Sequence, residues 1–173
     1  MSTRSAIGIL HDDGSVESIY CHHDGYLSGV GATLNKYYSD KESILNLMSH
    51  GDVRSLGSTV GETDFFPDCP SITYDSLGWF WEGFSHSDQE YCYLYTKEMG
   101  WVYTTVKNPN EIREWKSVSG ELALKKANNE IERLKGTIKR LQSAVDLLSG
   151  SSETIKDVLI SDDGPLMPED LSK

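Results

Sequence analysis

Between residues 124 and 148, apolar residues recur at alternating steps of three and four, which is the pattern of a coiled-coil helix. Such a helix carries one apolar stripe that must be buried against a partner. Read as heptads, β-branched residues dominate position a and Leu dominates position d, which favours a parallel two-stranded coiled coil. The seam positions are Leu124, Ala127, Ile131, Leu134, Ile138, Leu141, Val145 and Leu148.

Flanking charges fit the same register. Glu130 falls at position g and Lys135 at the following e, and these positions face each other across a parallel dimer. At about 1.5 Å per residue the seam spans about 37 Å. We therefore expect the chain to pair with a second copy of itself as a homodimer, with a trimer as the alternative.

The charge balance bears on the partners. The 173 residues include 16 Lys and Arg against 27 Asp and Glu, a formal net charge of −11, and most of the acidic excess lies in the first 116 residues. Nucleic-acid binding is driven by Lys and Arg that replace condensed counterions, so direct binding of DNA or RNA is disfavoured. Solubility is the simplest consequence of the acidity, and a basic protein partner or mimicry of nucleic acid is the alternative.

The cysteines and the N-terminus bear on the compartment. Cys21, Cys69 and Cys92 cannot all pair within one chain and none forms a C-x-x-C motif, which favours reduced thiols in cytoplasm. The first ten residues lack the apolar region and cleavage site of a signal peptide, and no window is apolar enough for a membrane span. We expect a soluble, unexported protein without a membrane partner.

The expected fold class is α+β, with a small antiparallel sheet of hairpins and short helices followed by a C-terminal coiled-coil helix. Residues 1–116 are expected to form an acidic globular domain, and residues 117–150 the helix, with its coiled-coil core at 124–148. Because Ser152 interrupts position a, residues 151–173 are expected to form a short helix around 153–160 and an acidic flexible tail.

Two hairpins are predicted in the first domain. Residues 3–10 and 15–22 flank Asp13-Gly14, which suits a two-residue turn with positive φ angles. That register places Ile9 opposite Ser18 and Ile7 opposite Tyr20, and the mixed faces indicate inner strands. Residues 91–96 and 101–106, joined by 97–100, form the second hairpin, with a row of tyrosines on one face.

Helices are predicted over 27–38, after the N-cap Asp40 as far as residues 50–51, and from Glu111 behind the cap Asn110. The last of these is expected to run into the coiled coil with a break near Gly120. Residues 54–57 are expected to form a brief strand or turn. Residues 58–71 read as a loop whose Phe65-Phe66 pair docks on the core.

The densest polar cluster is Cys21-His22-His23-Asp24, whose side chains are all of metal-ligating types. Neighbouring strand residues point to opposite faces, so they can share one ion only across a sharp bend at Gly25. Because no second cluster with ligand spacing accompanies them, a strand end with hydrogen-bonded side chains is favoured. The sequence therefore assigns no metal and no other cofactor.

Catalytic patterns are weak throughout. A nucleophile at Cys21 or Cys92 with a His base is disfavoured, since sequence neighbours rarely form a dyad and Cys92 alternates with tyrosines as a small buried side chain. Gly29-Val30-Gly31 lacks the remaining spacing of a dinucleotide loop. No carboxylate pair stands out for acid–base work. We assign no catalytic residue and predict that the chain is not an enzyme.

Aromatic residues concentrate between residues 74 and 103. Large rigid rings dominate binding hot spots, so some of these rings are candidate ligand or partner contacts. The alternative is that most of them form the core of a small domain with little Leu and Ile. Together with the polar cluster, the candidate binding residues are His22, His23, Asp24, Tyr26, Trp79, Trp81, Tyr93 and Trp101.

The opening residues 1–9 (MSTRSAIGI), the Asp-Gly hairpin and residues 20–26 (YCHHDGY) together resemble a family of small bacteriophage-encoded proteins that carry Y-C-H-W-D-G-Y-P. Gly51-Asp52 and residues 55–57 (SLG) also match the family's pattern, so the resemblance covers about the first third of the chain. The chain departs from that pattern at His23, where the family has Trp, and at Leu27, where it has Pro.

The resemblance implies a phage accessory protein in the cytoplasm of the infected bacterial host. Proteins of this kind often bind a host component, so the expected function is non-enzymatic, multivalent binding that modulates or inhibits a host or anti-phage-defence protein. One alternative is sequestration of a small nucleotide-type ligand in a pocket beside His22, Asp24, Tyr26 and the aromatic hairpin. Another is a structural component of the virion.

Overall fold

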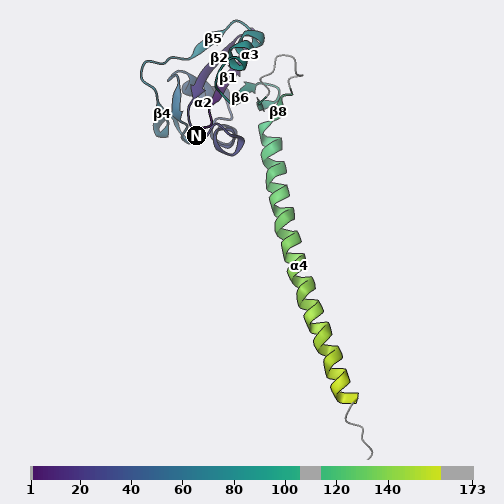
Figure 1. Ribbon diagram of the computed structural model, residues 1–173. Coiled ribbons are helices and arrows are strands. Elements are labelled where there is room, and N and C mark those ends of the chain that lie inside the picture. Colours follow the sequence, from purple (N-terminus) through teal and green to yellow (C-terminus); the bar gives the residue numbers. More distant parts are fainter. Residues whose placement is uncertain (1, 106–113, 161–173) are drawn as a thin grey trace, which may run out of the picture. The chain divides into compact units, whose positions relative to one another are not determined.

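The computed structural model describes residues 2–105 and 114–160, with side chains as far as residue 149. The chain divides after Lys125 into two compact units, of which the first is α+β and the second continues one long helix (Figure 1). Here η1 is a π-helix and η2 a 3-10 helix. The elements are β1 (Ser5–Leu10), β2 (Val16–Cys21), η1 (Leu27–Gly31), α1 (Ala32–Tyr37), α2 (Lys41–Met48), β3 (Val53–Ser55), η2 (Val60–Glu62), β4 (Asp64–Phe65), β5 (Ile72–Tyr74), α3 (Leu77–Ser85), β6 (Tyr91–Thr96), β7 (Gly100–Thr104), β8 (Lys116–Ser117) and α4 (Val118–Ile160).

Within the described residues, an eight-stranded sheet has the order β4-β3-β2-β1-β6-β7-β8, and β5 pairs with β2 as well. The α+β class is confirmed. The expectation of a sheet built only from antiparallel hairpins is wrong, because β1 pairs in parallel with β6 and β2 pairs in parallel with β3. Hairpin signals are local, whereas a parallel pair joins segments distant in sequence and leaves no turn signature.

The first hairpin forms, with both strands inside the sheet as expected, but its register differs from the prediction by one residue. The predicted partners of Ile9 and Ile7, Ser18 and Tyr20, each come one residue later in β2 than the residues that pair with these isoleucines in the structure. This register matters because a shift of one residue would turn every side chain to the other face. The observed pairs are Ile7 with Ile19 and Ile9 with Glu17.

The turn of this hairpin explains the difference. The N–H of Gly14 donates to the carbonyl of His11 at 3.0 Å, and the N–H of His11 donates to Ser15 at 2.9 Å. The loop therefore holds three residues instead of two, and Gly14 adopts a left-handed conformation with φ 87°. A type I turn followed by a left-handed glycine is the common three-residue hairpin.

Helices cover both faces of the sheet, because side chains of each strand alternate between two separate cores. On one face η1, α1 and α2 pack on the isoleucines of β1 and β2 and on Tyr93 and Trp101. On the other face, α3 packs Phe80, Trp81 and Phe84 against β1, β6 and β7. The core is thus two thin layers on either side of β1.

Most local predictions are confirmed. The helix expected over 27–38 is η1 followed by α1, and α2 starts behind Asp40, whose Oδ1 accepts the N–H of Ser43 at 2.9 Å. Strands β6 and β7 form the second hairpin, and rings of Tyr91, Tyr93 and Tyr103 lie along one face. The expected brief strand is β3, and Phe65 packs against the core as expected. The loop predicted over 58–71 is wrong at η2 and β4, because β4 forms by pairing with β3, and such a short pairing leaves no periodicity in the sequence.

Helix α4 begins later than expected. The helix predicted from residue 111 is wrong over 114–117, because Lys116 and Ser117 form β8 against β7; Asn110 and residues 111–113 lie outside the described residues. Gly120 does not break the helix, since it lies in the first turn, where its N–H reaches the Ser117 hydroxyl at 3.3 Å. Buried Val118 anchors this end of α4 to the core.

The far end of α4 also differs from the prediction. The helix continues through residues 149–152 to Ile160, so the separate short helix expected at 153–160 is part of α4. Residues 161–173, the predicted tail, lie outside the described residues. Among the helices that the structure describes, none is long and apolar enough to cross a membrane.

Tyr93 offers a test of this core. Its buried hydroxyl donates to the carbonyl of Gly25 at 2.8 Å. The substitution Tyr93→Phe leaves that carbonyl without its partner, so we expect the free energy of unfolding in urea to fall by about 1–3 kcal/mol. Tyr95→Phe is the matched control on the same strand, because its hydroxyl makes only an exposed contact of 3.4 Å with Ser39. Equal losses for both variants would contradict this packing.

Candidate functional site

The turn at residues 22–26 follows β2 and carries four of the sequence-predicted binding residues. The main chain fixes it on two sides: the N–H of His22 donates to Val53 at 2.9 Å, and the N–H of His23 donates to Arg54 at 3.0 Å. Asp24 has φ 55°, a left-handed conformation in which Asp is enriched. The backbone therefore presents a fixed turn rather than a free loop.

Gly25 seals this turn against the N-terminal segment. Its N–H donates to the carbonyl of Thr3 at 2.8 Å, and a Cβ at this position would lie 2.7 Å from the carbonyl carbon of Arg4. Only glycine permits that approach. The carbonyl of Gly25 in turn accepts the Tyr93 hydroxyl, so the turn is tied directly to the buried core.

Ring side chains gather beside the turn in what we call the histidine cluster, formed by Tyr20, His22, His23 and Phe66. The two imidazole centroids are 4.6 Å apart, and Phe66 meets His22 edge-on at 6.1 Å. The Tyr20 hydroxyl lies 2.6 Å from Nδ1 of His22. The hydroxyl of Ser2 contacts Nδ1 of His23 at 2.7 Å and the carbonyl of His22. Hydrogen bonds thus fix the orientation of both imidazoles.

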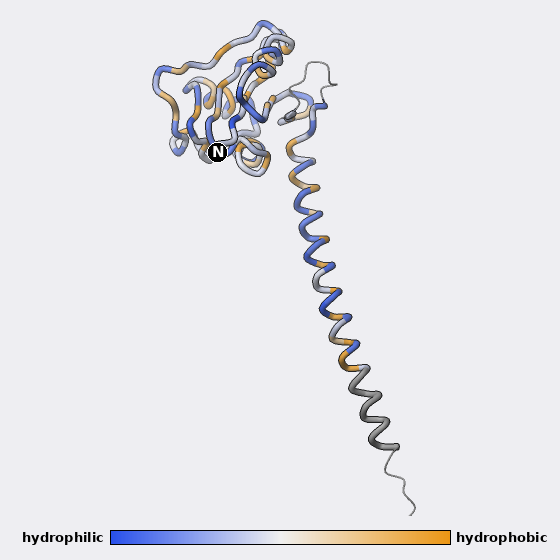
Figure 2. Tube along the Cα trace, viewed as in Figure 1, coloured by the Kyte–Doolittle hydropathy of each residue, from blue (hydrophilic) through white to orange (hydrophobic). Residues whose placement is uncertain are grey.

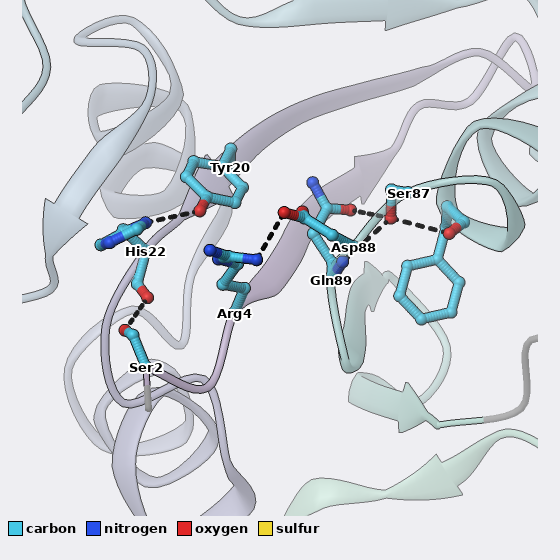
Figure 3. A network of polar contacts seen from close by, with 8 residues as sticks. Ser2, Arg4, Tyr20, His22, Ser87, Asp88 and Gln89 are labelled. Atoms are coloured by element: carbon cyan, nitrogen blue, oxygen red, sulfur yellow. Dashed lines mark hydrogen bonds and ion pairs between the residues drawn. The ribbon is translucent and has the colours of Figure 1, made fainter.

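A polar network continues from the cluster toward α3 (Figure 3). Arg4 lies between Tyr20 and the segment after α3, where its Nη1 pairs with Oδ2 of Asp88 at 2.5 Å. The buried Nε of Arg4 has no hydrogen-bond partner among the described residues. Next to this pair, the Ser87 hydroxyl donates to Gln89 at 3.0 Å. The network joins the N-terminal segment, β2 and the end of α3.

Asp52 supports the cluster from behind. Its Oδ1 accepts the N–H of Tyr20 at 2.7 Å, and its own backbone bonds to Cys69 and Phe66. Burial raises the pKa of the Asp52 carboxyl above its ordinary range, and the Tyr20 hydrogen bond opposes that shift. A half-buried carboxylate is therefore held beside aromatic rings.

The predicted aromatic residues do not converge on one surface. Tyr93 and Trp101 are buried in the core beneath α1 and α2, where the indole N–H of Trp101 donates to the carbonyl of Tyr38 at 2.7 Å. Trp81 is buried on the opposite face of the sheet. Trp79 alone of these four is exposed, at 63% of its surface, on α3. Three of the four rings therefore belong to the core, in agreement with the alternative prediction that most of these aromatic residues form the core of the domain.

The turn residues are placed differently. His23, Asp24 and Tyr26 are exposed and His22 is half-buried, so all four border solvent within one turn. Tyr26 lies close to Asp24, whose charge raises the pKa of the Tyr26 hydroxyl. Sequence reasoning missed Ser2, Arg4 and Phe66 as neighbours of the histidines, because they come from distant segments that only the sheet brings together.

The cysteines are placed for structure. Cys21 and Cys92 are buried, and burial raises the pKa of the Cys21 thiol to about 12 and that of Cys92 well above its usual value. Since the thiolate is the nucleophile and the metal ligand, both groups are inert at neutral pH. Within residues 2–105 and 114–149, no three His, Cys, Asp or Glu side chains are placed to hold a metal ion.

Helix α4 carries the second candidate surface. The seam side chains from Leu124 to Leu148 are exposed in the single chain, with Leu134 at 46% and Leu148 at 72% of their surface. Figure 2 shows hydrophobic residues recurring along an otherwise hydrophilic helix. Within the helix, Glu130 pairs with Arg133 at 2.7 Å and Lys135 with Glu132 at 2.8 Å.

Comparisons of the chain with protein-family models, with curated proteins and with solved structures found no match.

The raised pKa of the Asp52 carboxyl leads us to expect that the stability of the folded protein depends on pH. Because its folded pKa is raised, the folded state binds more protons just above pH 3.8, so its contribution to the free energy of unfolding falls as pH rises through the folded pKa. The variant Asp52→Asn keeps a side-chain oxygen that can accept the N–H of Tyr20, but it has no titrating carboxyl and so lacks this pH-dependent loss of stability. As pH rises from 3.8 through the folded pKa of Asp52, we expect the variant to become more stable relative to wild type, and above that pKa the difference should stay constant. Urea unfolding at a series of pH values measures this difference in the free energy of unfolding. Parallel stability curves for Asp52→Asn and wild type across this pH interval would contradict the prediction.

The three cysteines differ in exposure, so we expect their thiols to react at different rates. Cys69 is exposed, whereas Cys21 and Cys92 are buried and protonated. In the native protein we expect Ellman's reagent to titrate Cys69 rapidly and the other two only after denaturation. Cys69→Ser removes the fast phase. A fast phase that survives in this variant would show that a buried thiol is accessible.

Proposed function

We propose that this chain is a non-catalytic binding protein that acts as a parallel dimer joined along α4. The observation that carries the proposal is the exposed apolar seam of that helix. Beyond Lys125 the described side chains of α4 are almost all solvent-exposed in the single chain. Isolated helices gain little stability in water without tertiary packing, and a partner helix supplies it.

The composition of the seam favours a second copy as that partner. Its a positions are mostly β-branched and its d positions mostly Leu, the arrangement that suits parallel dimers. Burying an exposed Leu or Ile contributes roughly 1.5–3 kcal/mol relative to full exposure, and the seam repeats this gain at every turn. The ion pairs Glu130–Arg133 and Glu132–Lys135 within the helix involve no a or d residue, so they leave the seam free to pack against a second helix.

The recognition surface in this proposal is the turn at residues 22–26 with the adjoining histidine cluster. Its rings are held by backbone and side-chain hydrogen bonds, so little conformational entropy is lost on binding. Rigid aromatic and imidazole groups at a fixed turn suit a protein partner. The resemblance of this segment to phage accessory proteins suggests a host or defence protein, and two linked copies raise apparent affinity for a dimeric or repeated target.

A nucleotide-type ligand is the second candidate, because one hollow of the first unit suits an anionic aromatic molecule. It has a volume of about 410 Å³, and its walls include the stacked rings of Tyr91 and Tyr103. Two cations, Lys116 and Lys125, and one carboxylate, Glu114, also line it. Aromatic faces stack on bases and lysines attract phosphates. Saturable thermal stabilisation by a nucleotide panel that Tyr103→Ala abolishes would favour this candidate, and no shift with any nucleotide would exclude it.

The dimer is tested on the seam. Leu134→Gln with Leu141→Gln places two amides in the interface, and we expect the dimer dissociation constant of the full chain to rise by at least about 100-fold. Sedimentation equilibrium measures it. The matched control is Leu147→Gln, because Leu147 is 74% exposed on the same helix but lies off the seam.

The outcomes are distinct. Dissociation of the double variant with an unchanged control supports the proposed pairing. A wild-type chain that is monomeric at all concentrations, or a double variant with unchanged mass, contradicts it. Circular dichroism of the double variant separates loss of pairing from loss of the first unit, whose core contains neither leucine.

A further inference from the structure

A small cavity lies beneath α3, between that helix and the strands β2 and β5; we call it the α3 pocket. Its volume is about 140 Å³, below the roughly 300–1,000 Å³ of sites for drug-sized ligands. It therefore suits a very small molecule or a single side chain. Its walls are Ala6, Ser18, Ile19, Tyr20, Asp52, Ile72, Tyr74, Phe80, Gly83, Phe84, Ser87 and Gln89.

The pocket has an aromatic part and a charged part. Tyr74 and Phe80 meet edge-to-face, with centroids 5.6 Å apart, and Phe84 adds a third ring from α3. Gly83 brings α3 close to this wall, since a Cβ there would lie 2.9 Å from the Tyr74 hydroxyl. Tyr20 and Asp52 supply a hydroxyl-bearing ring and a carboxylate.

The lining of the pocket contains one carboxylate, Asp52, and no Lys, Arg or His side chain. Among the described residues, no Lys, Arg or His nitrogen lies within 4 Å of the Asp52 carboxylate, whose hydrogen bond comes from the Tyr20 N–H at 2.7 Å. The nearby Arg4 is already paired with Asp88 at 2.5 Å (Figure 3). Among the described residues, the Asp52 carboxylate that lines the pocket therefore has no cationic side chain paired with it.

We propose that the α3 pocket binds an organic cation, a primary ammonium or a guanidinium, with the charge at Asp52 and the alkyl chain among the rings of Tyr74 and Phe80. The carboxylate pairs with such cations and the ring faces bury the alkyl chain, whereas an anion would be repelled and a neutral alcohol would give the carboxylate no opposite charge. The site lies in the first unit and is independent of dimerisation through α4.

The ligand chemistry has two sources, a free amine or the Lys or Arg side chain of a protein. Both present the same cation on a flexible alkyl chain. A linear alkyl chain suits a cavity of about 140 Å³ whose walls include both aromatic rings and a carboxylate. The test therefore uses probes of both kinds on the full chain.

The first arm compares small probes by 1H–15N NMR titration. We expect n-butylammonium and n-butylguanidinium to give saturable shifts at residues lining the pocket. The neutral 1-pentanol and the anion butyrate should bind at least about tenfold more weakly, because they lack the charge pairing with Asp52. Equal binding of 1-pentanol, or no saturable shift with either cation, would overturn the proposal.

The second arm uses matched variants. Asp52→Asn should weaken butylammonium binding at least about tenfold, whereas Asp12→Asn removes the same charge from the exposed hairpin loop and should leave it unchanged. Gly83→Ala displaces Tyr74 and should also weaken binding, with Gly136→Ala as control, because a Cβ at Gly136 meets nothing within 4 Å. Unchanged affinity in folded Asp52→Asn would refute the charge role.

The last arm identifies the source. End-blocked Gly-Lys-Gly and Gly-Arg-Gly peptides are titrated under the same conditions. Binding as tight as that of the free amine supports a protein side chain as the occupant. Binding of the free amine alone supports a small metabolite, because the peptide backbone is then excluded from the entrance.

Discussion

The pairing of β1 with β2 on one side and with β6 on the other is the constraint on which the rest of the first unit depends. It buries both faces of β1 and separates the two cores. The parallel β1–β6 ladder starts where the N–H groups of Glu90 and Tyr91 meet the carbonyl of Arg4, at 2.8 and 3.3 Å. This contact brings residues 2–4 beside the segment after α3.

Both candidate surfaces of the first unit depend on strand pairings between segments distant in the sequence. Ser2 reaches the histidines only because the N-terminal segment runs beside the end of β2, and Arg4 reaches Asp88 only because β1 lies parallel to β6. The α3 pocket likewise needs β5 to pair with β2, since Tyr74 and Asp52 then face it from different segments. The sites are therefore products of sheet order rather than of any one motif.

Part of the candidate site was visible in the sequence. His22, His23, Asp24 and Tyr26 are neighbours in the chain, and a glycine between them marks a turn, so their shared position is local. The Phe66 ring beside His22 and the Asp52 carboxylate that accepts the Tyr20 N–H carry no such signal, because contacts between distant segments leave no periodicity. The tryptophans show the same limit: Trp79 and Trp81 lie two residues apart on α3, and only packing decides that one is exposed and the other buried.

Local signals in the amino-acid sequence were enough to specify both hairpins, the cap of α2 at Asp40 and a long helix with an apolar stripe. Periodicity and turn residues act over a few residues, which makes them legible without a fold. The parallel pairings, the start of α4 at Val118 and the position of Asp52 arise only in the tertiary structure. These depend on which distant surfaces bury each other, and burial is a property of the assembled chain.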